Sequence, residues 1–128
     1  MPSGASLTQL RRSPLRLRGR FVRAFYAAVA RTPGIQTAPS AWTRLPAFFL
    51  RGREIVHFQT SRALDFRLTH DVIRRERSIL RGDPRFQLRP HRSHWVLFKL
   101  SSAGDLATAL VLFSIAVAAN AADAAPRS

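Results

Sequence analysis

The sequence predicts an α+β domain with a largely antiparallel sheet of about five strands and three helices packed on it. Short apolar stretches with period-two alternation, separated by turn residues, predict the strands, and longer stretches with helical period predict the helices. The chain has 128 residues and no cysteine, which suits one domain and excludes a disulfide scaffold or thiol nucleophile. We place the domain at residues 20–121, after a disordered basic leader at 1–19 and before a tail at 122–128.

The first helix is predicted at residues 21–30, where Phe21, Phe25 and Val29 recur at helical spacing without a breaker. A proline and a glycine follow soon after and end this helix. The next stretch, residues 37–46, contains two prolines together with serine and threonine, and we expect a loop there.

A hairpin is predicted after this loop, with strands at 47–50 and 54–59 on either side of a glycine-centred turn. The next strand, at 64–68, alternates apolar and charged side chains. Pairing of these strands gives the sheet two different faces. The buried face is expected to hold Val56, Phe58, Phe66 and Leu68, joined by Val96 and Phe98 from a later strand. The opposite face is expected to hold His57, Gln59, Asp65 and Arg67.

The second helix is predicted at residues 70–81, with Thr69 as its N-cap and Asp71 in the first turn, where the helix dipole favours an anion. Its apolar stripe consists of Val72, Ile73, Ile79 and Leu80. Its arginines point elsewhere and are Arg74, Arg75, Arg77 and Arg81.

Two strands at 86–89 and 94–100 and a final helix at 103–120 complete the domain. Ser102 and Asp105 have the spacing of a capping box at the start of this helix. Residues 106–122 carry no charge, but a membrane span needs about 20 apolar residues. We therefore expect a buried helix and not a membrane span, and its second face could form a homodimer through residues 103–120.

The positive charge is unevenly distributed along the chain. The formal net charge is +14, and residues 1–53 hold ten arginines and no acidic residue. Twenty arginines against the single Lys99 are more typical of GC-rich coding than of a selected phosphate groove. The leader lacks the continuous apolar region of a signal peptide, and we favour a cytoplasmic location. An arginine-rich leader without acidic residues is also typical of a mitochondrial presequence, and a translation start placed too far upstream would produce the same pattern.

From Phe21 onward, the order of motifs resembles a small family called "luciferase domain", which is common in bacteria and fungi. The most specific matching segments are Glu54–Phe58, Asp65–Thr69 and Ser93–Trp95. Further matching segments are Arg31–Ile35, Ala38–Ser40, Pro46–Phe49, Gly52–Arg53, Arg89–Arg92, Val96 and Asp105–Leu110. The resemblance implies a mixed α+β domain, but it supplies no catalytic residues to carry over.

This chain departs from the family pattern at two polar positions. Family members carry a second histidine where Gln59 stands and an aspartate where His94 stands, so an activity that needs either group is in doubt here. Charged positions on the family's last helix are also replaced by apolar residues, which favours a buried or oligomeric helix.

His57 and Asp65 are the candidate catalytic residues, because a neighbouring carboxylate can orient an imidazole for general-base catalysis. The alternative is an ordinary polar pair on a solvent-facing strand surface, since no nucleophile or oxyanion donor is evident beside them. The candidate binding residues are Arg67, His94 and Trp95, and Trp42 is a further aromatic residue that could cover a pocket.

No metal site is predicted, because the loop spacing of His91 and His94 is only a weak signal even with His57 nearby. The sequence identifies no cofactor, and whether the domain is an enzyme stays open. Three classes of function are compatible with the sequence. The first is a small-molecule-binding or oxygen-using domain of the resembled family. The second is a nucleic-acid or polyanion-binding module that uses the leader and the arginines of residues 70–81, and the third is a structural homodimer.

Overall fold

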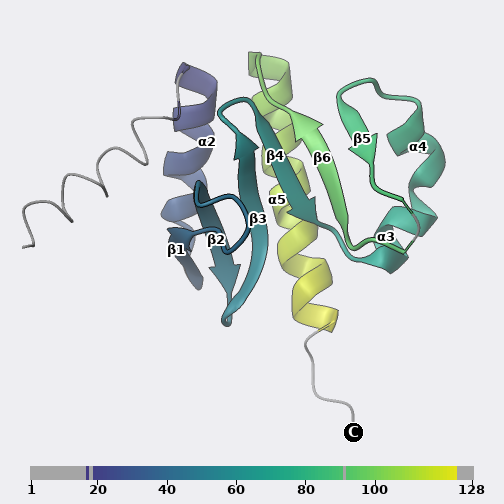
Figure 1. Ribbon diagram of the computed structural model, residues 1–128, viewed down its shortest axis with the longest axis horizontal. Helices are drawn as coiled ribbons and strands as arrows, with labels where there is room; N and C mark the ends of the chain where they lie inside the picture. Colours follow the sequence, from purple (N-terminus) through teal and green to yellow (C-terminus); the bar gives the residue numbers. More distant parts are fainter. Residues whose placement is uncertain (1–16, 18, 91, 124–128) are drawn as a thin grey trace, which may run out of the picture.

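The computed structural model describes Leu17 and residues 19–90 and 92–123. In chain order its elements are α2 (Arg20–Ala30), β1 (Ile35–Pro39), β2 (Pro46–Leu50), β3 (Arg53–Thr60), β4 (Ala63–Arg67), α3 (His70–Arg75), α4 (Arg77–Arg81), β5 (Phe86–Leu88), β6 (Trp95–Lys99) and α5 (Ala103–Asp123). The strands form one sheet, with α2 and α5 on one of its faces and the short α3 and α4 beside the β5 end (Figure 1). This is the α+β class predicted from the sequence.

The sheet has six strands in the order β1-β2-β3-β4-β6-β5, and every neighbouring pair is antiparallel. Strand β6 pairs with β4, and β5 pairs on the outer side of β6. In this register His57 lies opposite Asp65, and Asp65 lies opposite Leu97. The two candidate catalytic residues are therefore neighbours on adjacent central strands.

The hydrophobic core lies between the sheet and helices α2 and α5, with Phe25 of α2 at its centre. The Phe25 ring is fully buried and meets three sheet phenylalanines edge-on, at centroid distances of 5.9–6.3 Å. Such pairs contribute about 0.5–1.5 kcal/mol each beyond the burial of their area. The six side chains expected to face inward are all at most 2% exposed, which confirms the predicted alternation: Val56, Phe58, Phe66, Leu68, Val96 and Phe98. Leu17, inside the predicted leader, is also buried in this core.

The prediction of a loop throughout residues 37–46 is wrong, because residues 37–39 belong to strand β1. Four of the five β1 residues are exposed, so this edge strand lacks the apolar alternation that marks the central strands. The predicted helix at 70–81 is also wrong as a single element. It divides into α3 and α4 at Glu76, whose φ of −99° and ψ of 13° leave the helical region.

The break at Glu76 changes which side chains share a face. Ile73 and Leu80 are buried as expected, but Ile79 is 69% exposed because the two short helices do not share one continuous stripe. Thr69 precedes α3 as predicted, but its side chain makes no capping hydrogen bond.

Helix α5 begins with a variant of the expected capping box. The backbone N–H of Asp105 donates to Ser102 Oγ at 3.1 Å, and the Asp105 carboxylate accepts from the backbone N–H of Ser101 at 2.9 Å. Among the described residues, α5 is the one helix long and apolar enough to cross a membrane by length and composition, with a mean hydropathy of 1.7. One third of the 18 residues over which this hydropathy is averaged is buried inside the protein.

Candidate functional site

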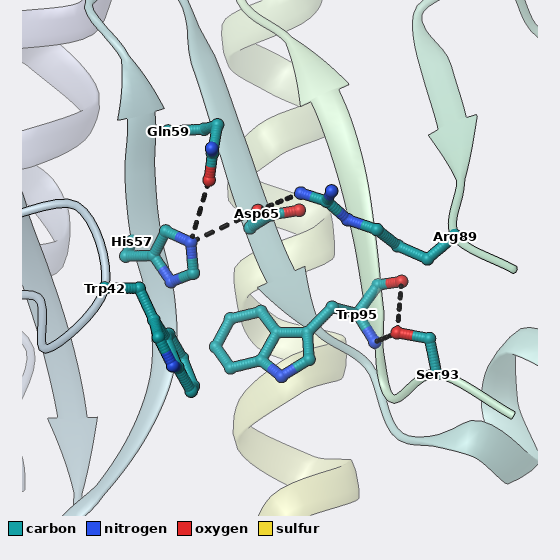
Figure 2. Close-up of a pocket in the computed structure, with 7 residues that line it drawn as sticks. All are labelled: Trp42, His57, Gln59, Asp65, Arg89, Ser93 and Trp95. Carbon is teal, nitrogen blue, oxygen red and sulfur yellow. Dashed lines mark hydrogen bonds and ion pairs between the residues drawn. The ribbon is translucent and has the colours of Figure 1, made fainter.

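A cavity of about 240 Å³ opens on the face of the sheet opposite α5. Figure 2 shows its lining side chains in front of β3, β4 and β6. They come from the three central strands, the β1–β2 loop and the segment between β5 and β6. The lining residues are Trp42, His57, Gln59, Asp65, Arg89, Ser93 and Trp95. The cavity therefore contains both candidate catalytic residues and one of the three candidate binding residues, Trp95.

His57 lies between two buried carboxylates. Its Nε2 is 3.1 Å from Asp65 Oδ2 and 3.3 Å from Gln59 Oε1, and its Nδ1 is 2.8 Å from Glu54 Oε2. The contact with Glu54 is close but lacks hydrogen-bond geometry. The side chains of His57, Glu54 and Asp65 are only 3–7% exposed. The solvent-facing polar pair considered from the sequence is therefore part of a buried polar cluster.

Glu54 was not among the candidates, because strand alternation places residues 54 and 57 on opposite faces. The register between β2 and β3 shifts between Phe48 and Phe49, and Ile55 has no partner in that pairing. An extra residue in one strand changes which face the following side chains take. This irregularity returns Glu54 to the face of His57, and no local feature of the sequence marks it.

Glu54 also holds the loop that carries Trp42. Its carboxylate accepts hydrogen bonds from Ser40 Oγ at 2.8 Å and from the backbone N–H of Ala41 at 3.3 Å. The same Ser40 Oγ accepts a hydrogen bond from the backbone N–H of Trp42 at 3.1 Å. On the far side of the loop, Thr43 Oγ1 donates to the carbonyl of Phe58 at 2.9 Å. The β1–β2 loop is therefore fastened to β3 at both ends.

Two indoles form the aromatic wall of the cavity. The centroid of the His57 ring lies 4.8 Å from that of Trp95 and 5.4 Å from that of Trp42, and the two indoles meet edge-on at 5.3 Å. The Trp95 backbone N–H donates to Ser93 Oγ at 3.0 Å, which fixes the start of β6 (Figure 2). Trp42 is 65% exposed, although a large apolar side chain on a fastened loop would gain free energy from burial.

Arg89 brings a cation to the cavity. It lies just beyond β5, and its Nη2 donates to Asp65 Oδ2 from across β6 (Figure 2). The other carboxylate oxygen, Asp65 Oδ1, is buried without a hydrogen-bond partner among the described residues. A buried acceptor of this kind is costly unless something donates to it, so it marks the place where a ligand or a water molecule would bind.

Two candidate binding residues, Arg67 and His94, do not line this cavity. The Arg67 guanidinium reaches the C-terminal end of α5, where Nη1 donates to Asn120 Oδ1 and lies 3.4 Å from Asp123 Oδ2. The Nδ1 atom of His94 accepts a hydrogen bond from the backbone N–H of His70 at 2.9 Å. Burial, followed by the nearby positive charge of Arg67, lowers the pKa of His94. Both side chains thus connect structural elements.

Two of the four arginines of α3 and α4 pair with neighbouring carboxylates. Arg74 lies 3.7 Å from Asp71 and Arg75 lies 3.4 Å from Glu76, in exposed ion pairs. The leader, which was part of the polyanion-binding hypothesis, lies outside the described residues apart from Leu17 and Gly19. Within the described ranges, no group of three or more histidine and acidic side chains is arranged to hold a metal ion, and His91 falls outside them.

These features define a class of protein: a small α+β domain with a buried histidine–carboxylate cluster beneath an aromatic wall on the open face of its sheet. The family model described as "Luciferase domain" matches residues 52–116, half of the chain. The chain belongs to the luciferase-domain family, which confirms the resemblance found in the sequence. Six of the seven cavity-lining residues lie within the match, and Trp42 lies before it. No curated protein and no solved structure matches the chain.

Proposed function

We propose that this domain binds a small organic molecule in the cavity beneath Trp42 and Trp95. In this proposal, the apolar part of the ligand contacts the two indoles, and a hydroxyl or other donor of the ligand reaches Asp65. The buried cluster of His57 with Glu54 and Asp65 is the observation that carries the proposal. Use of dioxygen, the other activity expected from the family resemblance, depends on the family name alone.

The cost of burying ionised groups is the first support for this proposal. Removing a carboxylate from water costs several kcal/mol, and ion pairing offsets this cost only when the geometry is very good. Here the Glu54–His57 contact lacks hydrogen-bond geometry and Asp65 Oδ1 has no partner among the described residues. A buried acceptor without a protein partner is satisfied when a bound molecule donates a hydrogen bond to it.

The shape of the cavity is the second support. Ligand sites are concave, mostly apolar, and carry a few convergent polar groups. A volume of about 240 Å³ is just below the usual range of roughly 300–1,000 Å³, so the site suits a small ligand or the end of a larger one. The indoles supply the apolar surface, and Asp65, Gln59 and Arg89 supply the polar groups.

The test compares two small probes that differ by one hydroxyl: coumarin and 7-hydroxycoumarin, titrated calorimetrically. We expect the hydroxylated probe to bind at least tenfold more tightly, because a hydrogen bond to a buried carboxylate contributes about 1.5–3 kcal/mol. Asp65→Asn should remove this difference, whereas the exposed matched control Asp71→Asn should retain it. Trp42→Ala should weaken both probes about tenfold, and Ile79→Ala, another exposed apolar residue, should not.

Two results would contradict the proposal. One is the absence of saturable binding by either probe to the unmodified protein. The other is binding that Trp42→Ala leaves unchanged, because the probe would then occupy another part of the molecule. Exposed Trp42 can be replaced without opening the core, so a loss of folding does not obscure this comparison.

A further inference from the structure

The side of α5 that faces away from the sheet is uncharged along almost the whole helix. Residues 106–122 contain no charged side chain, although the exposed face of a helix in a soluble protein normally carries several. Two large apolar side chains project there, Val111 at 59% and Ile115 at 37% exposure. The other exposed positions of this stretch hold small residues: Ala107, Ser114, Ala118 and Ala122.

Helix α2 packs beside α5 on the same side of the sheet (Figure 1). Its buried residues Val22, Phe25 and Val29 face the sheet. The opposite side of the helix is exposed and carries Arg20 and Arg23, and the exposed Arg31 follows at its C-cap. No acidic residue occurs anywhere in residues 1–53. A cationic strip therefore runs beside an apolar strip on the outside of the helix layer.

We propose that this helix-layer surface, formed by Arg20, Arg23, Val111 and Ile115, binds the surface of an anionic lipid bilayer. Apolar side chains can enter the boundary between headgroups and acyl chains, while arginines beside them pair with lipid phosphates and carboxylates. Clusters of four to eight basic residues on or next to a helix are typical of binding to anionic lipid. Residues 11–31 contain seven arginines and no acidic residue.

Charge complementarity favours a bilayer over a second copy of the chain. A two-fold contact through α5 would bring the arginines of two α2 helices toward one another, in chains that each carry a formal net charge of +14. An anionic bilayer attracts the same arginines.

The inner side of α5 argues that the helix lies on a bilayer and does not span it. Asp105 accepts hydrogen bonds from Ser101 and Arg85, and Asn120 donates to the carbonyl of Arg67. Phe113 and Ala116 are buried in the core. Insertion across a membrane would break these contacts, whereas surface binding leaves them in place.

The test measures co-sedimentation of the full chain with vesicles at about 0.15 M salt. The vesicles are pure phosphatidylcholine or three parts phosphatidylcholine to one part phosphatidylserine. We expect binding to the phosphatidylserine vesicles alone. The double variant Val111→Gln with Ile115→Gln should weaken it about tenfold, and Arg20→Gln with Arg23→Gln should do the same. The matched control on α4, Ile79→Gln with Arg81→Gln, should bind as the unmodified chain does.

Three results would overturn the proposal. Equal binding to both vesicle types would remove the role of anionic lipid. Unchanged binding of the Val111 and Ile115 variant would show that the arginines are sufficient without the apolar side chains of α5. A dimer in sedimentation equilibrium that this same variant dissociates would assign the surface to a second copy of the chain. The coumarin titrations do not depend on any of these results.

Discussion

The carboxylate of Glu54 lies 2.8 Å from Nδ1 of His57, although regular strand alternation would place the two side chains on opposite faces of β3. The unpaired Ile55 between them makes the contact possible. Through Ser40 and Ala41, the same carboxylate fastens the loop that carries Trp42. Glu54 is thus the physical link between the aromatic wall of the cavity and its histidine.

Glu54→Ala is expected to lower the free energy of unfolding by about 2–4 kcal/mol, because it leaves the Ser40 hydroxyl and the Ala41 N–H without their acceptor. Glu54→Gln should cost less, since its amide oxygen can still accept from Ser40 and Ala41. Urea denaturation measures both values. Equal destabilisation by the two variants would show that the negative charge, and not the loop contact, is what the fold requires.

Tryptophan fluorescence should report how the Glu54 variants affect the loop that carries Trp42. The chain has two tryptophans, and both pack against His57. Tryptophan emission of folded Glu54→Ala should therefore change, because the Trp42 loop loses its fastening. Ser114→Ala, whose exposed hydroxyl donates to the Leu110 carbonyl within α5, serves as the control and should leave the emission unchanged.

Asp65 and Arg89 form an ion pair in which Asp65 is buried and Arg89 is partly exposed. Substitutions of the two residues should therefore lower the stability of the fold by different amounts. The Asp65 side chain is 3% exposed and also contacts His57, whereas the Arg89 side chain is 36% exposed. Asp65→Ala should cost about 2–3 kcal/mol, because it removes a buried hydrogen-bond partner of His57 together with the acceptor for Arg89. Arg89→Ala should cost only about 1 kcal/mol, because water reaches its site. Chemical denaturation of both variants measures the difference, and equal losses would contradict this assignment of burial.

Much of the sheet could be predicted from the sequence because β4, β6 and residues 56–58 of β3 follow period two. Phe66 and Val96 lie opposite one another on the buried face, as their alternation indicates, and the same alternation places His57 beside Asp65. The neighbours of this pair could not be predicted in the same way. Glu54 depends on an irregular register, and Arg89 depends on the order of β4, β6 and β5. That order is a long-range property of the fold.

Edge strand β1 and the break at Glu76 escaped prediction for a different reason. Both faces of β1 are largely exposed, so its sequence bears no apolar period. Residues on either side of Glu76 are good helix formers, so nothing in the local sequence marks the break between α3 and α4.

His94 should make the fold less stable in weak acid. Its pKa is lowered, chiefly by burial and then by Arg67, and its Nδ1 must be unprotonated to accept the hydrogen bond from His70. The full stability is therefore present above the ordinary histidine pKa near 6.5 and is lost as the pH falls through the lower folded value. Urea denaturation between pH 7.5 and about 5 measures this loss.

The matched variant for this experiment is His94→Asn, whose side-chain oxygen can accept the same hydrogen bond but does not titrate. Its stability should vary less with pH over that range than the stability of the unmodified chain. An identical pH dependence would assign the loss to another group.

Asp105 should govern part of the stability at lower pH. Burial alone would raise its pKa, but hydrogen bonds from the Ser101 backbone, then from Arg85 and the neighbouring serine hydroxyls, hold that pKa below its ordinary value. A carboxyl group with a lowered pKa stabilises the fold above its unfolded value near 3.8, and the contribution is lost as the pH falls through the folded value.

Asp105→Ala should therefore cost about 1–3 kcal/mol at neutral pH, because it removes the cap of α5 and a partner of Arg85. The stability of Asp105→Ala should also fall less steeply than that of the unmodified chain as the pH decreases below about 4. The exposed Asp71→Ala is the control, and a loss as large in that variant would show that the position at the start of α5 has no special role.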